Sequence, residues 1–229
     1  MERILPERKL IDHIEVNITK EDVLRKMGMP ADHRFGDAIA EVIDEVKPIA
    51  NGKLLYCEAK IGERTEETIE IGGITFTGKD LVDALKDVDT VYPYICTCGT
   101  EINDAAMNCK DLVKMFYLDN IAHFYLLQPS IELSDILDNQ LGTRTTCMTP
   151  GSFENWNLNQ NAPIYILLNK GEGTGVTMNE YALMTPAKSV AGIRFKTSDC
   201  EKKCNICMKR NCENRVEEFS KTIYEDTLC

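Results

Sequence analysis

The 229-residue sequence has no apolar run long enough to cross a membrane and no basic block longer than Lys202-Lys203. A membrane-spanning helix needs about 18 or more apolar residues in succession. The formal net charge is −11, and an acidic surface repels phosphate backbones. These absences argue against a membrane protein and against a nucleic-acid partner. The first residues also lack the apolar core of a signal peptide, so we expect a cytoplasmic protein.

Histidine is scarce, and no set of residues typical of nucleophilic catalysis is present. The three histidines, His13, His33 and His123, stand apart, and no serine or cysteine occupies a recognisable nucleophile elbow. The glycines between 171 and 175 lack the third glycine and the strand-before, helix-after context of a dinucleotide fingerprint. The sequence therefore indicates no catalytic residue of its own.

The hydrophobic pattern mixes helical and strand periods, and 43% apolar residues suffice for a sizeable core. Helices are expected within 18–50, at 79–86, and from 103 toward 128, where Pro129 is expected to kink or break the helix before it continues over 131–141. Strands are expected within 54–77, as a hairpin about Gly72-Gly73, and at 90–98 (half-buried), 178–184 and 189–195. No shift in composition precedes Ser198. We therefore predict one domain over 1–197 and a cysteine-rich, metal-binding segment over 198–229.

A polar elbow over 145–153 precedes the only tryptophan, Trp156. Pro150 fixes one backbone angle and Gly151 has no Cβ, so this loop is able to present bare backbone groups to a ligand at close range. The elbow is therefore a candidate binding loop.

Ten cysteines are present, and without a secretory signal they favour metal or redox chemistry over disulfides. Four of them form a compact run, Cys200-x3-Cys204-x2-Cys207-x4-Cys212. Such closely successive cysteines are more typical of an iron–sulfur cluster than of structural zinc, although both remain open. The run also matches radical enzymes, but it lies too late in the chain for that class. The six scattered cysteines are expected to be mostly small buried hydrophobes.

Four stretches, taken in order, resemble the activation (reactivation) domain of cobalamin-dependent methionine synthase, in its short stand-alone form. They are residues 23–28 (VLRKMG), 97–102 (TCGTEI), 149–152 (TPGS) with Trp156 and Gln160, and 175–192 (GVTMNEYALMTPAKSVAG). The resemblance spans roughly residues 17–212, and the last stretch is the most specific.

The resemblance implies an α+β fold, a single curved domain whose twisted antiparallel sheet is flanked by helices. It also implies an accessory module for the reductive activation of a corrinoid methyltransferase. Such a module binds S-adenosylmethionine as methyl donor and docks on a cobalamin-binding partner, with a low-potential electron donor as a further partner. It is a methyltransferase component and no complete methyltransferase. The alternatives are an iron–sulfur electron-transfer protein on this fold and a zinc-stabilised docking protein that does not bind S-adenosylmethionine.

The resemblance also implies the ligand contacts. They are two acids that follow the family's positions and the elbow itself: Asp119, Glu132, Thr149, Pro150 and Gly151. The family has an arginine at the position of Cys147 and a tyrosine at that of Ser152. A cysteine cannot replace an arginine as a bidentate grip on a carboxylate. Arg194, or Arg144 just upstream of the elbow, is the candidate to compensate.

Overall fold

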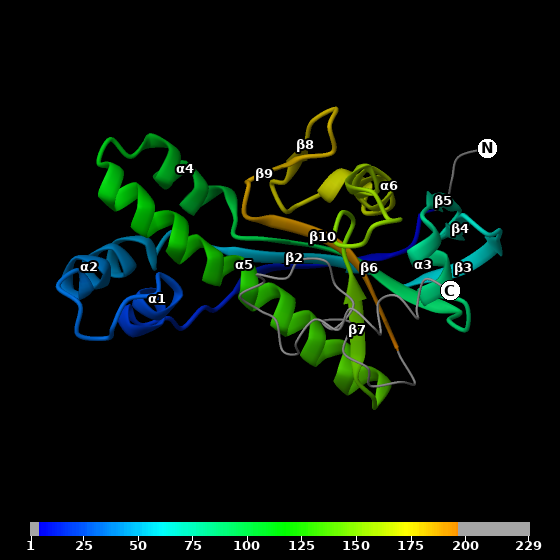
Figure 1. The fold of residues 1–229 in the computed structure, drawn as a ribbon, viewed down its shortest axis with the longest axis horizontal. Coiled ribbons are helices and arrows are strands. Elements are labelled where there is room, and N and C mark those ends of the chain that lie inside the picture. Colours follow the sequence, from blue (N-terminus) through cyan, green and yellow to red (C-terminus); the bar gives the residue numbers. More distant parts are fainter. Residues whose placement is uncertain (1–4, 197–229) are drawn as a thin grey trace.

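The structure is a computed structural model that describes residues 5–196. Within these residues, eight strands form one sheet in which every pairing is antiparallel, and helices pack around it (Figure 1). The first five strands are β1 (Arg8–Ile14), β2 (Gly52–Cys57), β3 (Ala59–Arg64), β4 (Thr68–Ile71) and β5 (Ile74–Thr77). The others are β6 (Thr90–Thr97), β7 (Thr145–Met148) and β10 (Ser189–Lys196). The predicted α+β fold with an antiparallel sheet flanked by helices is thus confirmed.

β6 is the centre of the sheet. β10 pairs along one edge of it, from Ser189↔Thr97 to Phe195↔Val91, while β2 and β3 share its other edge. The prediction that this strand is half-buried is wrong, because it is buried from Val91 to Thr97. Alternate residues of β6 pack into separate cores on the two faces of the sheet, so neither face is left to solvent.

The hairpin about Gly72-Gly73 is confirmed. β4 and β5 pair from Thr68↔Thr77 to Ile71↔Ile74, and both glycines have positive φ, +58° and +78°. Two successive positive φ angles match the right-handed twist of the flanking strands and favour glycine over other residues. The next helix, α3 (Lys79–Ala84), also lies where the sequence predicts it.

Two of the predicted helices form a layer at one end of the molecule. α1 (Lys20–Lys26) begins at a capping box, in which Thr19 and Asp22 each accept a hydrogen bond from the other's backbone N–H. α2 (Gly36–Val46) buries one stripe against α1 and the first half of the long helix α5.

The helix expected from residue 103 is divided differently. α4 (Thr100–Asn108) ends early, and α5 (Leu112–Leu141) begins after Asp111, whose carboxylate accepts hydrogen bonds from the N–H groups of Val113 and Lys114. Pro129 does not break α5, which continues to Leu141. A proline removes one helical hydrogen bond, but the stripe of Tyr125, Leu133 and Leu137 stays buried across it. Although α5 has 30 residues, no helix in the described range is long and apolar enough to cross a membrane.

The chain from the elbow to β10 contains three short helices and a small hairpin. The helices are η1 (Leu158–Gln160), α6 (Asn161–Leu167) and η2 (Asn169–Gly171). The hairpin consists of β8 (Thr177–Met178) and β9 (Met184–Thr185). The strand predicted over 178–184 is therefore wrong. The Asn179 side chain accepts hydrogen bonds from the N–H groups of Tyr181 and Leu183, which bends this stretch into a turn.

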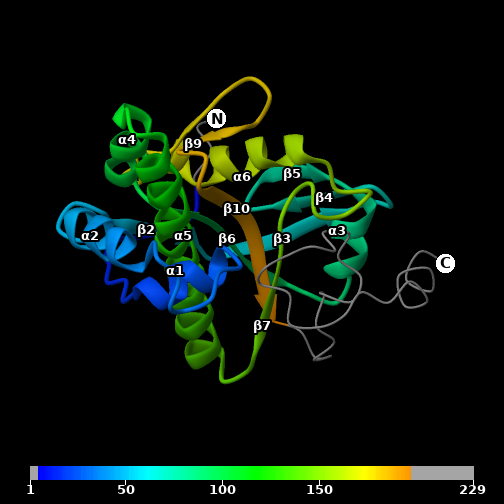
Figure 2. The same ribbon diagram turned by 60° about the vertical axis from the view of Figure 1, so that its left-hand side comes forward.

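The two faces of the sheet carry different layers. One face packs with α3 and α6, while α5 covers the other (Figure 2). Ala191, Ile193 and Phe195 of β10 belong to the α6 face. Because side chains alternate along a strand, Arg194 faces α5.

Candidate functional site

Arg194 is a buried arginine between the sheet and the second half of α5. The residue is only 8% exposed. Its Nη1 donates to Ser134 Oγ on α5 at 3.0 Å, and to Oγ1 and the carbonyl oxygen of Thr145 on β7 at 2.8 and 3.4 Å. Its Nε is buried and has no hydrogen-bond partner among the described residues. Leaving a buried donor unsatisfied is costly, so this guanidinium has binding capacity that residues 5–196 do not use.

Cys147 lies directly opposite Arg194 in the β7–β10 pairing, and opposed residues of an antiparallel pair point to the same face. Tyr94 of β6 is paired with Gly192 of β10, and its side chain lies over Gly192 on the face that carries Arg194 and Cys147. A Cβ added to Gly192 would lie 2.7 Å from the Tyr94 hydroxyl. Burial raises the pKa of Tyr94 well above its usual value, Cys147 and Cys96 raise it further, and Arg194 opposes the rise. Tyr94 is therefore a neutral phenol at physiological pH.

The elbow is a closed turn. The N–H of Gly151 donates to the Trp156 carbonyl oxygen at 2.8 Å, and the N–H of Ser152 donates to the Thr149 carbonyl oxygen at 3.2 Å. The hydroxyls of Thr149 and Ser152 are 2.6 Å apart, and Pro150 is buried. These two N–H groups are therefore used within the loop, contrary to the expectation of bare backbone donors. Contacts of the elbow with a ligand would have to come from its other groups.

Asp119 lies on the first half of α5 and pairs with a lysine. Its Oδ2 is 3.0 Å from Nζ of Lys188, the residue before β10, and the Asp119 side chain is 59% exposed. An exposed pair of this kind contributes only about 0–1 kcal/mol to stability. The Lys188 carbonyl oxygen also accepts a hydrogen bond from the Cys98 N–H, which fixes this end of β10 against the TCGTE stretch.

Of the expected ligand residues, Asp119 and Glu132 lie on α5 and Arg194 lies on β10, whereas the other three form the elbow after β7. Asp119 and Lys188 mark one end of the site, and Ser134 with Arg194 marks the other. From Asp119 to Ser134 the helix rises by roughly 20 Å. Glu132 is half-buried on α5 two residues before Ser134. Helix residues two apart do not face each other, so Glu132 does not share the face on which Ser134 contacts Arg194. One ligand contacts both ends only if it is extended.

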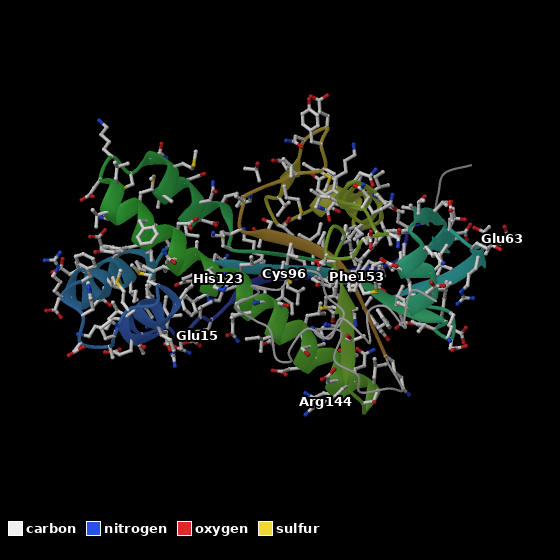
Figure 3. The ribbon with its side chains drawn as sticks, in the orientation of Figure 1. Glu15, Glu63, Cys96, His123, Arg144 and Phe153 are labelled. Atoms are coloured by element: carbon white, nitrogen blue, oxygen red, sulfur yellow. The ribbon has the colours of Figure 1, made fainter. Side chains whose placement is uncertain are left out.

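The two arginines proposed to compensate for Cys147 have different surroundings. Arg144 is exposed at the turn between α5 and β7, away from Cys96 in the interior (Figure 3). Arg194 is buried beside Cys147. The structure thus brings a guanidinium to the position of Cys147 from the neighbouring strand, and Arg194 is the one that supplies it.

Three further residues contribute to this site: Ser134 of α5, Thr145 of β7 and Tyr94 of β6 lie around Arg194 and Cys147. Thr145 opens the elbow that the sequence marks as a candidate loop, whereas Ser134 and Tyr94 belong to no sequence motif. The one hint for Ser134 is its polar side chain directly after the buried Leu133 of α5.

The predicted metal ligands Cys200, Cys204, Cys207 and Cys212 lie outside the described residues. Within residues 5–196 no group of three or more histidine, cysteine or acidic side chains is placed to hold a metal ion. Of the scattered cysteines, Cys57, Cys96 and Cys98 are buried, as predicted, while Cys109 and Cys147 are half-buried.

Together these features define an α+β domain with one antiparallel sheet and a set of polar groups between its long helix and its last strand. Its fold is that of the methionine synthase reactivation domain. The chain is similar to the crystal structure of the MetH reactivation domain bound to AdoHcy, with a TM-score of 0.62 and 13% sequence identity. The match covers 83% of this chain and 78% of that one. At this identity the likeness shows the fold, and it confirms the resemblance at that level.

The sequence comparisons add nothing to this result. No family model matches the chain, and no curated protein matches it.

Proposed function

We propose that this protein binds S-adenosylmethionine and acts as an activation module for a corrinoid-dependent methyltransferase. The observation that carries the proposal is the fold shared over 83% of the chain with a reactivation domain bound to AdoHcy. AdoHcy is what S-adenosylmethionine becomes when its methyl group is lost. When bound, S-adenosylmethionine supplies an electrophilic methyl group on a positively charged sulfur.

Arg194 is the residue we assign to the carboxylate of the ligand. Its unpartnered Nε supports this role, because a carboxylate can accept hydrogen bonds from two nitrogens of one guanidinium. Ser134 and Thr145 hold Nη1 in place, so little side-chain freedom is lost on binding. The departure at Cys147 is then compensated on the adjacent strand.

The two acids are assigned to the cationic groups of the ligand. Asp119 already faces a cation, Lys188, at 3.0 Å, and an exposed carboxylate can exchange that partner at little cost. Glu132, two residues before Ser134 on α5, is the second acid of this assignment. Thr149, Pro150 and Gly151 form the adjoining rigid turn.

Calorimetry with S-adenosylmethionine tests the proposal. Arg194→Gln should weaken binding by about 1.5–3 kcal/mol, the worth of a hydrogen bond to a charged group. Arg144→Gln is the matched control, because it removes an exposed arginine from the same part of the chain, and it should leave the affinity unchanged. Absence of binding by the unmodified protein would refute the proposal.

Asp119→Ala tests the far end of the site separately. We expect binding to weaken by about 1–3 kcal/mol if the acid pairs directly with the ligand, while stability changes by less than about 1 kcal/mol. Asp135→Ala removes another exposed acid from α5 and serves as the control. Equal affinities for the two variants would remove Asp119 from the site.

The proposed partner is a protein that carries a corrinoid, and reactivation also needs a low-potential electron. The four-cysteine run would serve as an iron–sulfur relay for that electron, or alternatively as a zinc site that stabilises the segment 198–229. Metal analysis and visible spectra of anaerobically purified protein separate these two. Transfer of labelled methyl from S-adenosylmethionine to a corrinoid protein under reducing conditions tests the partner.

A further inference from the structure

We propose that Cys147 is a thiolation site for small disulfides that carry a carboxylate, and that Arg194 recognises that carboxylate. The Cys147 sulfur forms a bond to one sulfur of the small disulfide, whose own sulfur–sulfur bond breaks. The other half leaves as a thiol and takes up the proton that Cys147 releases, so no further oxidant is required. One consequence rests on the proposed function: the adduct occupies the space beside Arg194 and excludes S-adenosylmethionine.

Accessibility separates Cys147 from most of the other described thiols. Cys57, Cys96 and Cys98 are fully buried, and burial raises the pKa of Cys57 and Cys98 to about 12. A thiol that stays protonated and covered does not attack a disulfide. Cys147 differs from these three, because it is half-buried and lies on the edge strand β7, so we expect a small reagent to reach it.

Arg194 is the second observation, independent of the thiol. It lies opposite Cys147 on the same face, it is more than nine-tenths buried, and its Nε has no hydrogen-bond partner among the described residues. No acidic side chain of residues 5–196 forms an ion pair with it within 4 Å. The Asp138 carboxylate reaches Arg194 only through Thr145, whose Oγ1 donates to Asp138 Oδ1 at 2.7 Å and accepts from Arg194 Nη1 at 2.8 Å. A buried guanidinium that has no direct ion pair and an unused Nε favours a ligand that brings a carboxylate.

The surroundings determine which adduct fits. Ser134 of α5 and Thr145 of β7 orient the guanidinium through hydrogen bonds. The neutral Tyr94 hydroxyl lies over Gly192 and bounds the site on that side. The site therefore offers one fixed cation and hydroxyl groups, and the acid in this hydrogen-bond network, Asp138, already accepts from the N–H and hydroxyl of Thr145. A disulfide that ends in ammonium groups would meet the guanidinium with a like charge.

Cys109 provides an internal control in the same molecule. It is also half-buried, but it lies between α4 and α5, and its Sγ donates to the Asp111 carbonyl oxygen at 3.3 Å. Its reactivity reports general access and the effect of the net charge of −11, which favours cationic reagents everywhere on the protein.

The experiment compares two reagents on the reduced, full-length chain. Glutathione disulfide carries carboxylates, and cystamine carries only ammonium groups. Peptide mapping by mass spectrometry gives the labelling rates of Cys147 and Cys109 with each. We expect the ratio of the glutathione rate to the cystamine rate to be about tenfold or more higher at Cys147 than at Cys109, as one charge-assisted hydrogen bond allows. Arg194→Gln should reduce the Cys147 ratio to that of Cys109, and Arg194→Lys should retain part of the preference.

Equal ratios at the two cysteines in the unmodified protein would overturn the proposal, whether or not the Arg194 variants fold. Formation of a Cys147–Cys96 disulfide in place of the adduct would also overturn it. Calorimetry of the thiolated protein then tests the consequence, with Cys147→Ser as the variant that cannot be blocked. If the reduced protein binds S-adenosylmethionine and the thiolated protein binds it equally well, exclusion is refuted and the proposed function stands. If the reduced protein does not bind it, the proposed function fails while the adduct is still measured.

Discussion

Replacing Gly192 with alanine should destabilise the domain, because this glycine lets β10 pass beneath Tyr94. A Cβ at this position would lie 2.7 Å from the Tyr94 hydroxyl and 2.7 Å from the carbonyl oxygen of Met148. Carbon and oxygen atoms that are not bonded rarely approach so closely. The ring carbon Cζ of Tyr94 would be 2.8 Å away as well. One of these three atoms belongs to the backbone, so the clash cannot be relieved by rotating a flexible side chain.

The magnitude follows from overpacking. One methyl group inserted into a packed interior costs typically about 1–3 kcal/mol, and three contacts shorter than 3.0 Å place Gly192→Ala in the upper half of that range. For a domain of this size each kcal/mol lowers the melting temperature by about 2–4 °C. We therefore expect a loss of about 2–3 kcal/mol, or roughly 5–10 °C.

Urea unfolding followed by the fluorescence of Trp156 measures this loss, since the only tryptophan is fully buried and becomes exposed on unfolding. Gly36→Ala is the matched control. Its Cβ would meet nothing closer than a flexible lysine carbon at 3.5 Å, and it is the first residue of α2, where alanine should be favoured by no more than the about 0.5–1 kcal/mol of a helix interior. The two glycine-to-alanine changes should therefore have opposite signs.

A double-mutant cycle with Tyr94→Leu tests the assigned cause. Removing the ring relieves the contacts with the hydroxyl and with Cζ, so the double variant should be more stable than the sum of the single effects predicts, by about 0.5 kcal/mol or more. If Gly192→Ala is neutral, or if the two changes are simply additive, the proposed crossing of Tyr94 over Gly192 is wrong.

Three further predictions concern thiols, pH and a helix cap. Iodoacetamide should modify Cys147 in the native protein, but Cys57 and Cys98 only after unfolding, as peptide mapping will show. Because the native fold raises the pKa of these two buried thiols to about 12, it keeps protons that the unfolded chain releases near its ordinary pKa. Their contribution to the free energy of unfolding is therefore complete below about pH 8.5 and declines toward pH 12, by a few kcal/mol in total. Where these thiols dominate, urea midpoints should decrease from about pH 8.5 to pH 12 and stay constant between pH 6 and 8. Thr19→Ala removes the capping box with Asp22 and should cost about 0.5–2 kcal/mol; an unchanged midpoint would contradict it.

Several features were predictable because they depend on local chemistry. The Gly72-Gly73 hairpin follows from the φ angles of glycine, and the start of α1 follows from Thr19 and Asp22. The long helix was harder, because Pro129 signals a break by local rules. Burial of Tyr125, Leu133 and Leu137 against the sheet outweighs that signal, and such packing is formed by distant residues.

The candidate site also has features that local sequence predicts and features that depend on tertiary packing. The sequence by itself determined the class of fold, through four stretches in a fixed order, and it marked the elbow, the two acids and Arg194 as candidates. Only the tertiary structure decided that Arg194 and Cys147 share a face, that Ser134 and Thr145 orient the guanidinium, and that two elbow N–H groups are already used. The physical reason is that periodicity and turn chemistry act over a few neighbouring residues, whereas strand register and the facing of α5 on β10 join residues far apart in the chain.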